Sequence, residues 1–223
     1  MQSRMKRSTI PERLYLSLLA FDLLLRIVAA VPNVYTFKQG VSSVEELFVI
    51  GGVLPVHKTF NGSCGRIDGL TFQYVESISY VVQQINSRQA SLNLSGVKLS
   101  FEIYDSCGTI NIALQQTLRL LAPKNGTAAS AVIGEEESSV TIPIANLLQL
   151  FHVPQISFVS TTPSLSDKSQ YGYFVRTCPS DSFQARALVD IANHFNWSYI
   201  VAIHSSDIYG LAGIKAFIDN FQN

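Results

Sequence analysis

Short apolar stretches alternate with amphipathic ones along most of this chain, and the alternation constrains the fold more than any other feature. Residues 47–55 and 131–134 are apolar runs that end in loop residues, as buried parallel strands do. Residues 70–86 carry apolar side chains at helical spacing. The complete prediction is strands at 47–55, 97–104, 131–134, 155–159, 173–177 and 199–203, and helices at 70–86, 110–121, 138–151, 181–195 and 210–221. This repetition favours an α/β fold with a mainly parallel sheet flanked by helices.

The composition suits a globular chain and excludes several functions. Of the 223 residues, 47% are apolar and 14% are charged, and the formal net charge of zero provides no basic surface for nucleic acid. We find no nucleophile elbow, phosphate-binding loop, dinucleotide motif or His/Cys metal spacing. The sequence therefore predicts no enzyme activity, no cofactor, no metal site and no nucleic-acid partner.

The first 30 residues have the pattern of a signal peptide. Basic residues precede an apolar run at 14–31, and small residues at Ala29 and Ala30 suit cleavage. Asp22 and Arg26 interrupt the run and make it a poor membrane span, while a buried helix remains an alternative. Export agrees with four glycosylation sequons, at Asn61, Asn93, Asn125 and Asn196. Three cysteines, at 64, 107 and 178, permit at most one internal disulfide.

Hydroxyl side chains gather in residues 157–184, between apolar stretches. Ser138 is a predicted N-cap, and free amides at a helix N-terminus suit a carboxylate, although ordinary capping is the favoured explanation of this motif taken alone. Thr161 ends the next strand, so it should reach the same sheet edge. Asp181 begins a later helix, and Tyr209 should end the last strand. Donors for an anion, an acid for a cation and a covering ring together suit an α-amino acid.

Several separate motifs carry a family resemblance. They are Gly134-x-x-x-Ser-Ser-Val140, Ile144-x-Asn-Leu-Leu-Gln-Leu-Phe-x-Val-Pro-Gln-Ile156, Leu165-Ser-Asp-Lys168, Pro179-Ser-Asp-Ser-Phe-Gln-Ala185 and Asn196-Trp-x-Tyr199. With their spacing, they closely resemble the ligand-binding domain of class C G-protein-coupled receptors, and most of all that of metabotropic glutamate receptors. The resemblance covers roughly residues 47–217.

The resemblance implies a type I periplasmic-binding-protein-like clamshell that closes on its ligand. Residues 31–178 would form the first lobe, and residues 179–223 the start of a second lobe that is incomplete in this chain. By position, the ligand-binding residues would be Ser138, Ser139 and Thr161 from the first lobe and Asp181 and Tyr209 from the second, with Tyr74 beside them. The implied ligand is an amino acid or a related small amine.

Further expectations concern covalent structure and partners. Cys64 and Cys107 match an intralobe disulfide of the family, which leaves Cys178 as a buried, inert thiol. Receptors of this class dimerise through the first lobe, but residues 123–130 lack the cysteine that links their dimers covalently. The protein would then lie on the extracellular side of the cell membrane and reach a G protein only through a transmembrane domain that this chain lacks.

Two departures bear on the ligand. Tyr74 stands where glutamate receptors of the family have an arginine for the distal carboxylate, and Leu70 replaces a nearby tyrosine. This favours a neutral or aromatic amino acid. Residues 135–137 are three glutamates in place of small residues, and we expect them to face outward and complement the helix N-terminus, with a divalent-cation site as the minor alternative.

Competing functions share the same fold. A secreted, soluble amino-acid-binding module or decoy would use the same site, and only the sequence beyond residue 223 would separate it from a receptor. A natriuretic-peptide-receptor-type or transport-type relative is a third possibility, which the sequons and the Pro179-Ser-Asp181 motif disfavour.

Overall fold

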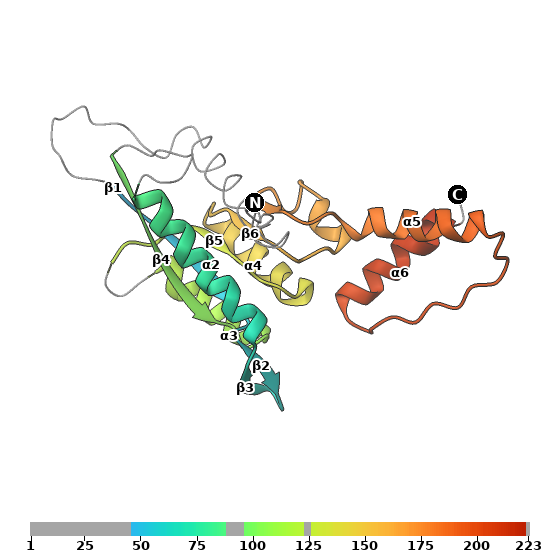
Figure 1. Ribbon diagram of the computed structural model, residues 1–223, viewed down its shortest axis with the longest axis horizontal. Coiled ribbons are helices and arrows are strands. Elements are labelled where there is room, and N and C mark those ends of the chain that lie inside the picture. Colours follow the sequence, from blue (N-terminus) through green and yellow to red (C-terminus); the bar gives the residue numbers. More distant parts are fainter. Residues whose placement is uncertain (1–45, 88–95, 123–125, 222–223) are drawn as a thin grey trace, which may run out of the picture.

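The computed structural model describes residues 46–87, 96–122 and 126–221, and its core is a five-stranded parallel sheet in the order β4-β1-β5-β6-β7 (Figure 1). The strands are β1 (Glu46–Leu54), β4 (Val97–Asp105), β5 (Ala129–Ile133), β6 (Gln155–Ser157) and β7 (Phe174–Arg176). Among the described residues, the helices that flank this sheet are α2 (Gly69–Asn86), α3 (Ile110–Leu121) and α4 (Ser138–Leu150). The predicted α/β fold is therefore confirmed, and these elements begin and end within two residues of the predicted bounds.

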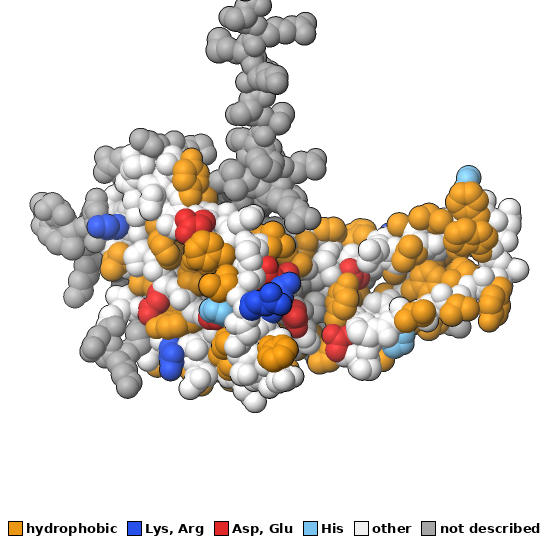
Figure 2. Space-filling model, turned by 60° about the horizontal axis from the view of Figure 1, so that its bottom comes forward, with side chains coloured by type: hydrophobic (Ala, Val, Ile, Leu, Met, Phe, Trp, Pro, Cys, Tyr) orange, Lys and Arg blue, Asp and Glu red, His pale blue; other side chains and the backbone are white. Residues whose placement is uncertain are grey.

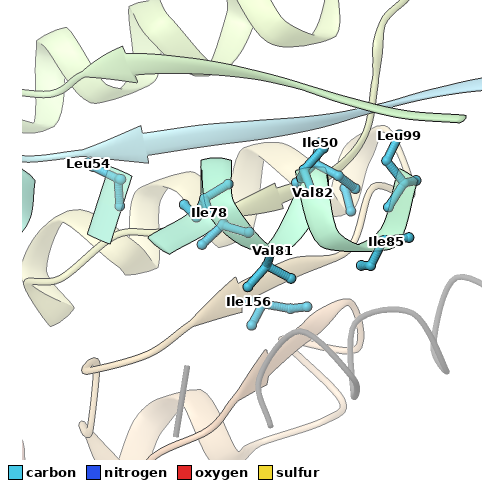
Figure 3. Packing of buried hydrophobic residues seen from close by; sticks show 10 residues of the cluster. Ile50, Leu54, Ile78, Val81, Val82, Ile85, Leu99 and Ile156 are labelled. Carbon is cyan, nitrogen blue, oxygen red and sulfur yellow. The ribbon is translucent and has the colours of Figure 1, made fainter. Parts of the chain in front are cut away.

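The sheet is buried on both faces because its strands alternate between two apolar cores. Ile50 and Leu54 of β1 pack with α2, whereas Val53 of the same strand packs with α3 and α4. Figure 3 shows the α2 side of this arrangement, with Ile78, Val81, Val82 and Ile85 directed at Ile50, Leu99 and Ile156. Burial on both faces explains why the central strands β1 and β5 are largely apolar.

A short hairpin extends from the sheet and was absent from the predicted elements. It consists of β2 (His57–Phe60) and β3 (Ser63–Ile67), which pair antiparallel. The turn is Asn61-Gly62, and both residues have positive φ, 48° and 75°, as a two-residue hairpin turn requires. An Asn-Gly pair is the signal that would have revealed it. The predicted disulfide between Cys64 and Cys107 is present and ties this hairpin to the end of β4.

Residues 181–221, here called the C-terminal arm, extend from one end of the sheet as α5 (Asp181–His194) and α6 (Ile208–Phe221) (Figure 1). The predicted strand at 199–203 is wrong, because this segment has no regular structure and Ile203 is 96% exposed. A strand needs a neighbour to pair its backbone groups, and none of the described strands lies beside this segment. Tyr209 consequently lies in the first turn of α6, not at the end of a strand.

Candidate ligand site

The loop between β5 and α4 forms the base of the site. Gly134 has φ +124°, and a Cβ there would lie 2.0 Å from the carbonyl oxygen of Val53, so only glycine fits against β1. Glu137 is the N-cap of α4 and makes no side-chain capping bond, and Ser138 is the first helical residue. The prediction that Ser138 caps the helix is therefore wrong. Its buried hydroxyl instead accepts a weak hydrogen bond from the Thr162 amide at 3.4 Å.

That contact places the N-terminus of α4 beside the loop that follows β6. The two segments were predicted to share one sheet edge, because both follow neighbouring parallel strands, and the pairing of β5 with β6 confirms this. Ser139 lies next to Ser138 in the first turn and is partly exposed. Amides in the first turn of a helix that lack an intrahelical partner suit an anion.

Several hydroxyls of the run at 157–184 support the loop and are not free for a ligand. Ser157 donates to the main-chain oxygen of Glu135 at 2.7 Å, and Ser160 lies 3.1 Å from the same oxygen. Ser160 also contacts the Thr141 hydroxyl at 2.5 Å, and Gln155 donates to the Gly134 oxygen at 2.8 Å. All of these side chains are buried, so this network fixes the loop's shape. The sequence alone does not identify these supporting residues, because their hydrogen-bond partners are remote in the chain.

Thr161 and Asp181 meet directly, although they are 20 residues apart. The Thr161 hydroxyl donates to the Asp181 carboxylate at 2.8 Å, and the Asp181 amide donates to the Thr161 oxygen at 2.9 Å. Ser180 caps α5 through the Ser182 amide, so Asp181 occupies the first turn and is not needed as the cap. The Asp181 carboxylate and Thr161 hydroxyl together form an acceptor pair that suits an ammonium group.

Arg176, at the end of β7, holds the loop that carries Thr161. Its guanidinium donates to the carbonyl oxygens of Ser160 at 3.2 Å and Thr162 at 2.8 Å, and to the Ser166 hydroxyl at 2.5 Å. Burial lowers the pKa of Arg176, and the nearby Cys178 and Asp181 oppose this effect. Thr161 is thereby held between two anchored carbonyls.

The three glutamates do not all face outward, so that prediction is wrong for Glu135. Its side chain is fully buried, and its carboxylate accepts the amides of Glu136 at 2.8 Å and Glu137 at 3.0 Å and the hydroxyl of Ser106. Burial raises the pKa of Glu135 to about 7, although these hydrogen bonds act to lower it. Glu136 is partly buried against Thr71, and burial followed by the charge of Asp68 raises its pKa. Glu137 is exposed, as predicted.

Tyr74 of α2 contacts a second aromatic side chain, that of Phe158. Its ring packs on Phe158, with centroids 4.5 Å apart, at the carboxyl end of β6. Both rings also pack against the core that α2 buries. The position therefore presents an aromatic surface. One turn earlier in α2, the Thr71 hydroxyl donates a weak hydrogen bond at 3.4 Å to the carboxylate of Glu136, which lies in the loop before α4.

On the arm, Asp181 and Tyr209 line a common cavity of about 510 Å³ between α5, residues 200–205 and α6. Its other walls are largely apolar, and Figure 2 shows hydrophobic side chains gathered on the arm. Tyr209 is 42% exposed. Ser138, Ser139, Thr161 and Tyr74 do not line this cavity. Asp181 therefore connects the two sets of predicted residues. It is hydrogen-bonded to Thr161, and it lines the same cavity as Tyr209.

The remaining predicted positions are the glycosylation sequons, the signal-like segment and the cysteines. Asn61 and Asn196 are exposed, with positive φ of 48° and 53°, whereas Asn93, Asn125 and the signal-like residues 1–30 lie outside the described residues. Within the described part, Cys64, Asp105 and Cys107 bring three possible metal ligands together, but both sulfurs are committed to the disulfide. Cys178 is free and partly buried, and burial raises its pKa.

Comparison with known proteins identifies the class. Residues 74–223 match the model of the family described as "Receptor family ligand binding region", and the chain belongs to this family. It is 39% identical over 196 residues to "Probable metabotropic glutamate receptor mgl-1" of Caenorhabditis elegans, covering 76% of this chain and 19% of that protein. It is 36% identical over 193 residues to "Metabotropic glutamate receptor" of Drosophila melanogaster, covering 75% of this chain and 20% of that protein.

These matches confirm the resemblance to class C receptor ligand-binding domains, and the relatives belong to a receptor family that is not enzymatic. The chain spans about a fifth of the length of these curated relatives. Within the described residues, no helix is both long and apolar enough to cross a membrane.

Proposed function

We propose that this chain is the amino-acid-sensing part of an extracellular ligand-binding region in a metabotropic glutamate receptor-like protein. The observation that carries the proposal is the Thr161–Asp181 pair next to the N-terminus of α4. Amides and the hydroxyls of Ser138 and Ser139 would bind the carboxylate. Thr161 and Asp181 would bind the ammonium group, and Tyr209 would cover it.

Residues 31–178 would form the first lobe, and residues 179–223 would begin the second. The Thr161–Asp181 pair spans this boundary, so a ligand that binds both residues would favour closure of the lobes. The disulfide and the exposed sequons at Asn61 and Asn196 support an extracellular location. Dimerisation through the first lobe and signalling through a G protein are part of this proposal, because receptors of this class act in that way.

The ligand we propose is a neutral or aromatic amino acid, or a related small amine. Tyr74 and Phe158 present rings where a distal carboxylate would need a cation. The partly buried acid Glu136 adds unfavourable charge for a second carboxylate. Both features oppose glutamate and leave the binding of the α-amino and α-carboxylate groups unaffected.

Isothermal titration calorimetry of the full chain with L-phenylalanine, L-alanine and L-glutamate tests the proposal. We expect binding of a neutral probe that is stronger than that of glutamate. Asp181→Asn should weaken it about 10- to 150-fold, the equivalent of a charge-assisted hydrogen bond of about 1.5–3 kcal/mol. Asp190→Asn, an exposed acid on the same helix, is the matched control and should leave affinity unchanged. Tighter binding of glutamate, or equal effects of the two variants, would refute the proposal.

A further inference from the structure

The buried carboxyl of Glu135 lies immediately before the proposed carboxylate site, and the proposed function does not use it. It is 0% exposed, on the residue three positions before Ser138. Glutamate is rarely buried to this extent without a partner. Here the partners are hydrogen-bond donors and not cations, because none of the described ion pairs includes Glu135.

Glu135 connects three segments of the site. One carboxylate oxygen accepts the amides of Glu136 and Glu137, and the other accepts the hydroxyl of Ser106, which follows β4. Its main-chain oxygen accepts a hydrogen bond from the hydroxyl of Ser157, the last residue of β6. The side chain therefore positions the amides that lead into α4, and it does so with a group that can gain or lose a proton.

The charged groups near this carboxyl favour its neutral form. Glu137, on the same loop, adds a like charge, and Glu136 lies between them in the chain. Asp105, next to Ser106, is paired with His57 at 2.5 Å. The strands on the other side contribute the uncharged Gln155 and Ser157. A carboxylate ligand at the first turn of α4 would place one more negative charge beside the group.

We propose that Glu135 is a positioning residue that takes up a proton from solvent when the carboxylate of an amino acid binds at the first turn of α4, so that affinity rises as pH falls. This rests on the proposed function. The burial that raises its pKa to about 7 places the transition in the neutral range. The sign follows from linkage. A bound anion raises the pKa of Glu135 further, so affinity is highest below the ligand-free pKa and declines as pH rises towards the ligand-bound pKa.

Two arms test the inference with the full chain. In the first, the carboxyl carbon of Glu135 is titrated by NMR with ¹³C-labelled glutamate, and the resonance is assigned by its loss in Glu135→Gln. We expect a titration near pH 7 without ligand, and a rise of about one pKa unit with saturating L-phenylalanine or L-alanine. A ligand-free midpoint in the ordinary glutamate range, or no change with a bound probe, would overturn the inference.

In the second arm, calorimetry measures the affinity for the same probes between pH 6 and pH 8.5. The wild-type chain should lose about tenfold in affinity for each pKa unit of coupling, whereas Glu135→Gln should bind with nearly constant affinity at the wild-type acid limit. A purely structural role would instead weaken Glu135→Gln at every pH. His57→Gln and Glu137→Gln control for other groups, and either one abolishing the pH dependence would overturn the assignment. If the wild-type chain binds a probe with an affinity that does not change with pH, only this inference is refuted. If it binds neither probe, the proposed function is refuted as well.

Discussion

Removing the disulfide between Cys64 and Cys107 should cost about 4 kcal/mol of unfolding free energy. The bridge closes a segment with a sequence separation of 43 residues. Loop-closure entropy for a loop of that length is about 13 cal/mol/K, or about 4 kcal/mol at 25 °C. The bridge also fixes the β2–β3 hairpin to the end of β4, where Thr59 donates to the Cys107 carbonyl. This hydrogen bond should persist in part after the sulfurs are removed. We therefore expect the unfolding free energy to fall by the loop-closure entropy alone.

Urea unfolding of the double variant Cys64→Ala/Cys107→Ala measures the effect. With an m-value of about 2.5 kcal/mol/M, the midpoint should fall by about 1.6 M. Cys178→Ser is the matched control, because this thiol is free and should leave the midpoint nearly unchanged. A loss below about 1 kcal/mol in the double variant would refute the reasoning, since it would mean that the bridge adds little constraint to the unfolded chain.

Four other predictions follow from the same structure. Ile144→Ala, in the core between α4 and the sheet, should cost about 2–5 kcal/mol in urea unfolding, whereas Leu150→Ala, 75% exposed, should change stability by less than about 0.5 kcal/mol. Gly134→Ala should prevent normal folding of the β5–α4 loop, seen as loss of secreted protein, because its Cβ would clash with β1. Arg176→Met should cost about 1–3 kcal/mol by leaving carbonyls unpaired. Because folding raises the Glu135 pKa from 4.5 to about 7, stability should fall by about 3 kcal/mol as pH rises through that window, and Glu135→Gln should remove this slope in pH-dependent unfolding.

The elements that sequence analysis predicted well are those whose pattern reports a local environment. Strand β1 is an uninterrupted apolar run because both of its faces are buried, and α2 shows helical spacing because one of its faces packs on the sheet. The segment 199–203 has an equally apolar pattern, yet it is not a strand. Apolar composition indicates a tendency to be buried, but pairing requires a neighbouring strand, which composition does not specify.

Glu135 shows a second limit of pattern-based prediction. Three successive acids before a helix are typical of an exposed turn that complements the helix dipole, and Glu137 follows that rule. Glu135 does not, because Ser106, 29 residues earlier, supplies a hydroxyl and the loop turns its own amides inward. The burial of an acid is decided by donors that only the tertiary structure brings together.

The hydroxyl-rich residues 157–184, which suggested a ligand site, have two different roles, because the tertiary structure decides which partner each hydroxyl finds. Ser157 and Ser160 satisfy carbonyls of the β5–α4 loop and are buried, so they shape the site without being open to a ligand. Thr161 differs in that its hydroxyl donates to Asp181 and leaves its oxygen lone pairs free to accept from an ammonium group. The number of hydroxyls therefore indicates that the region is polar and ordered. The proposal that Thr161 contacts the ligand rests on its hydrogen bond to Asp181, the first residue of α5 in the C-terminal arm.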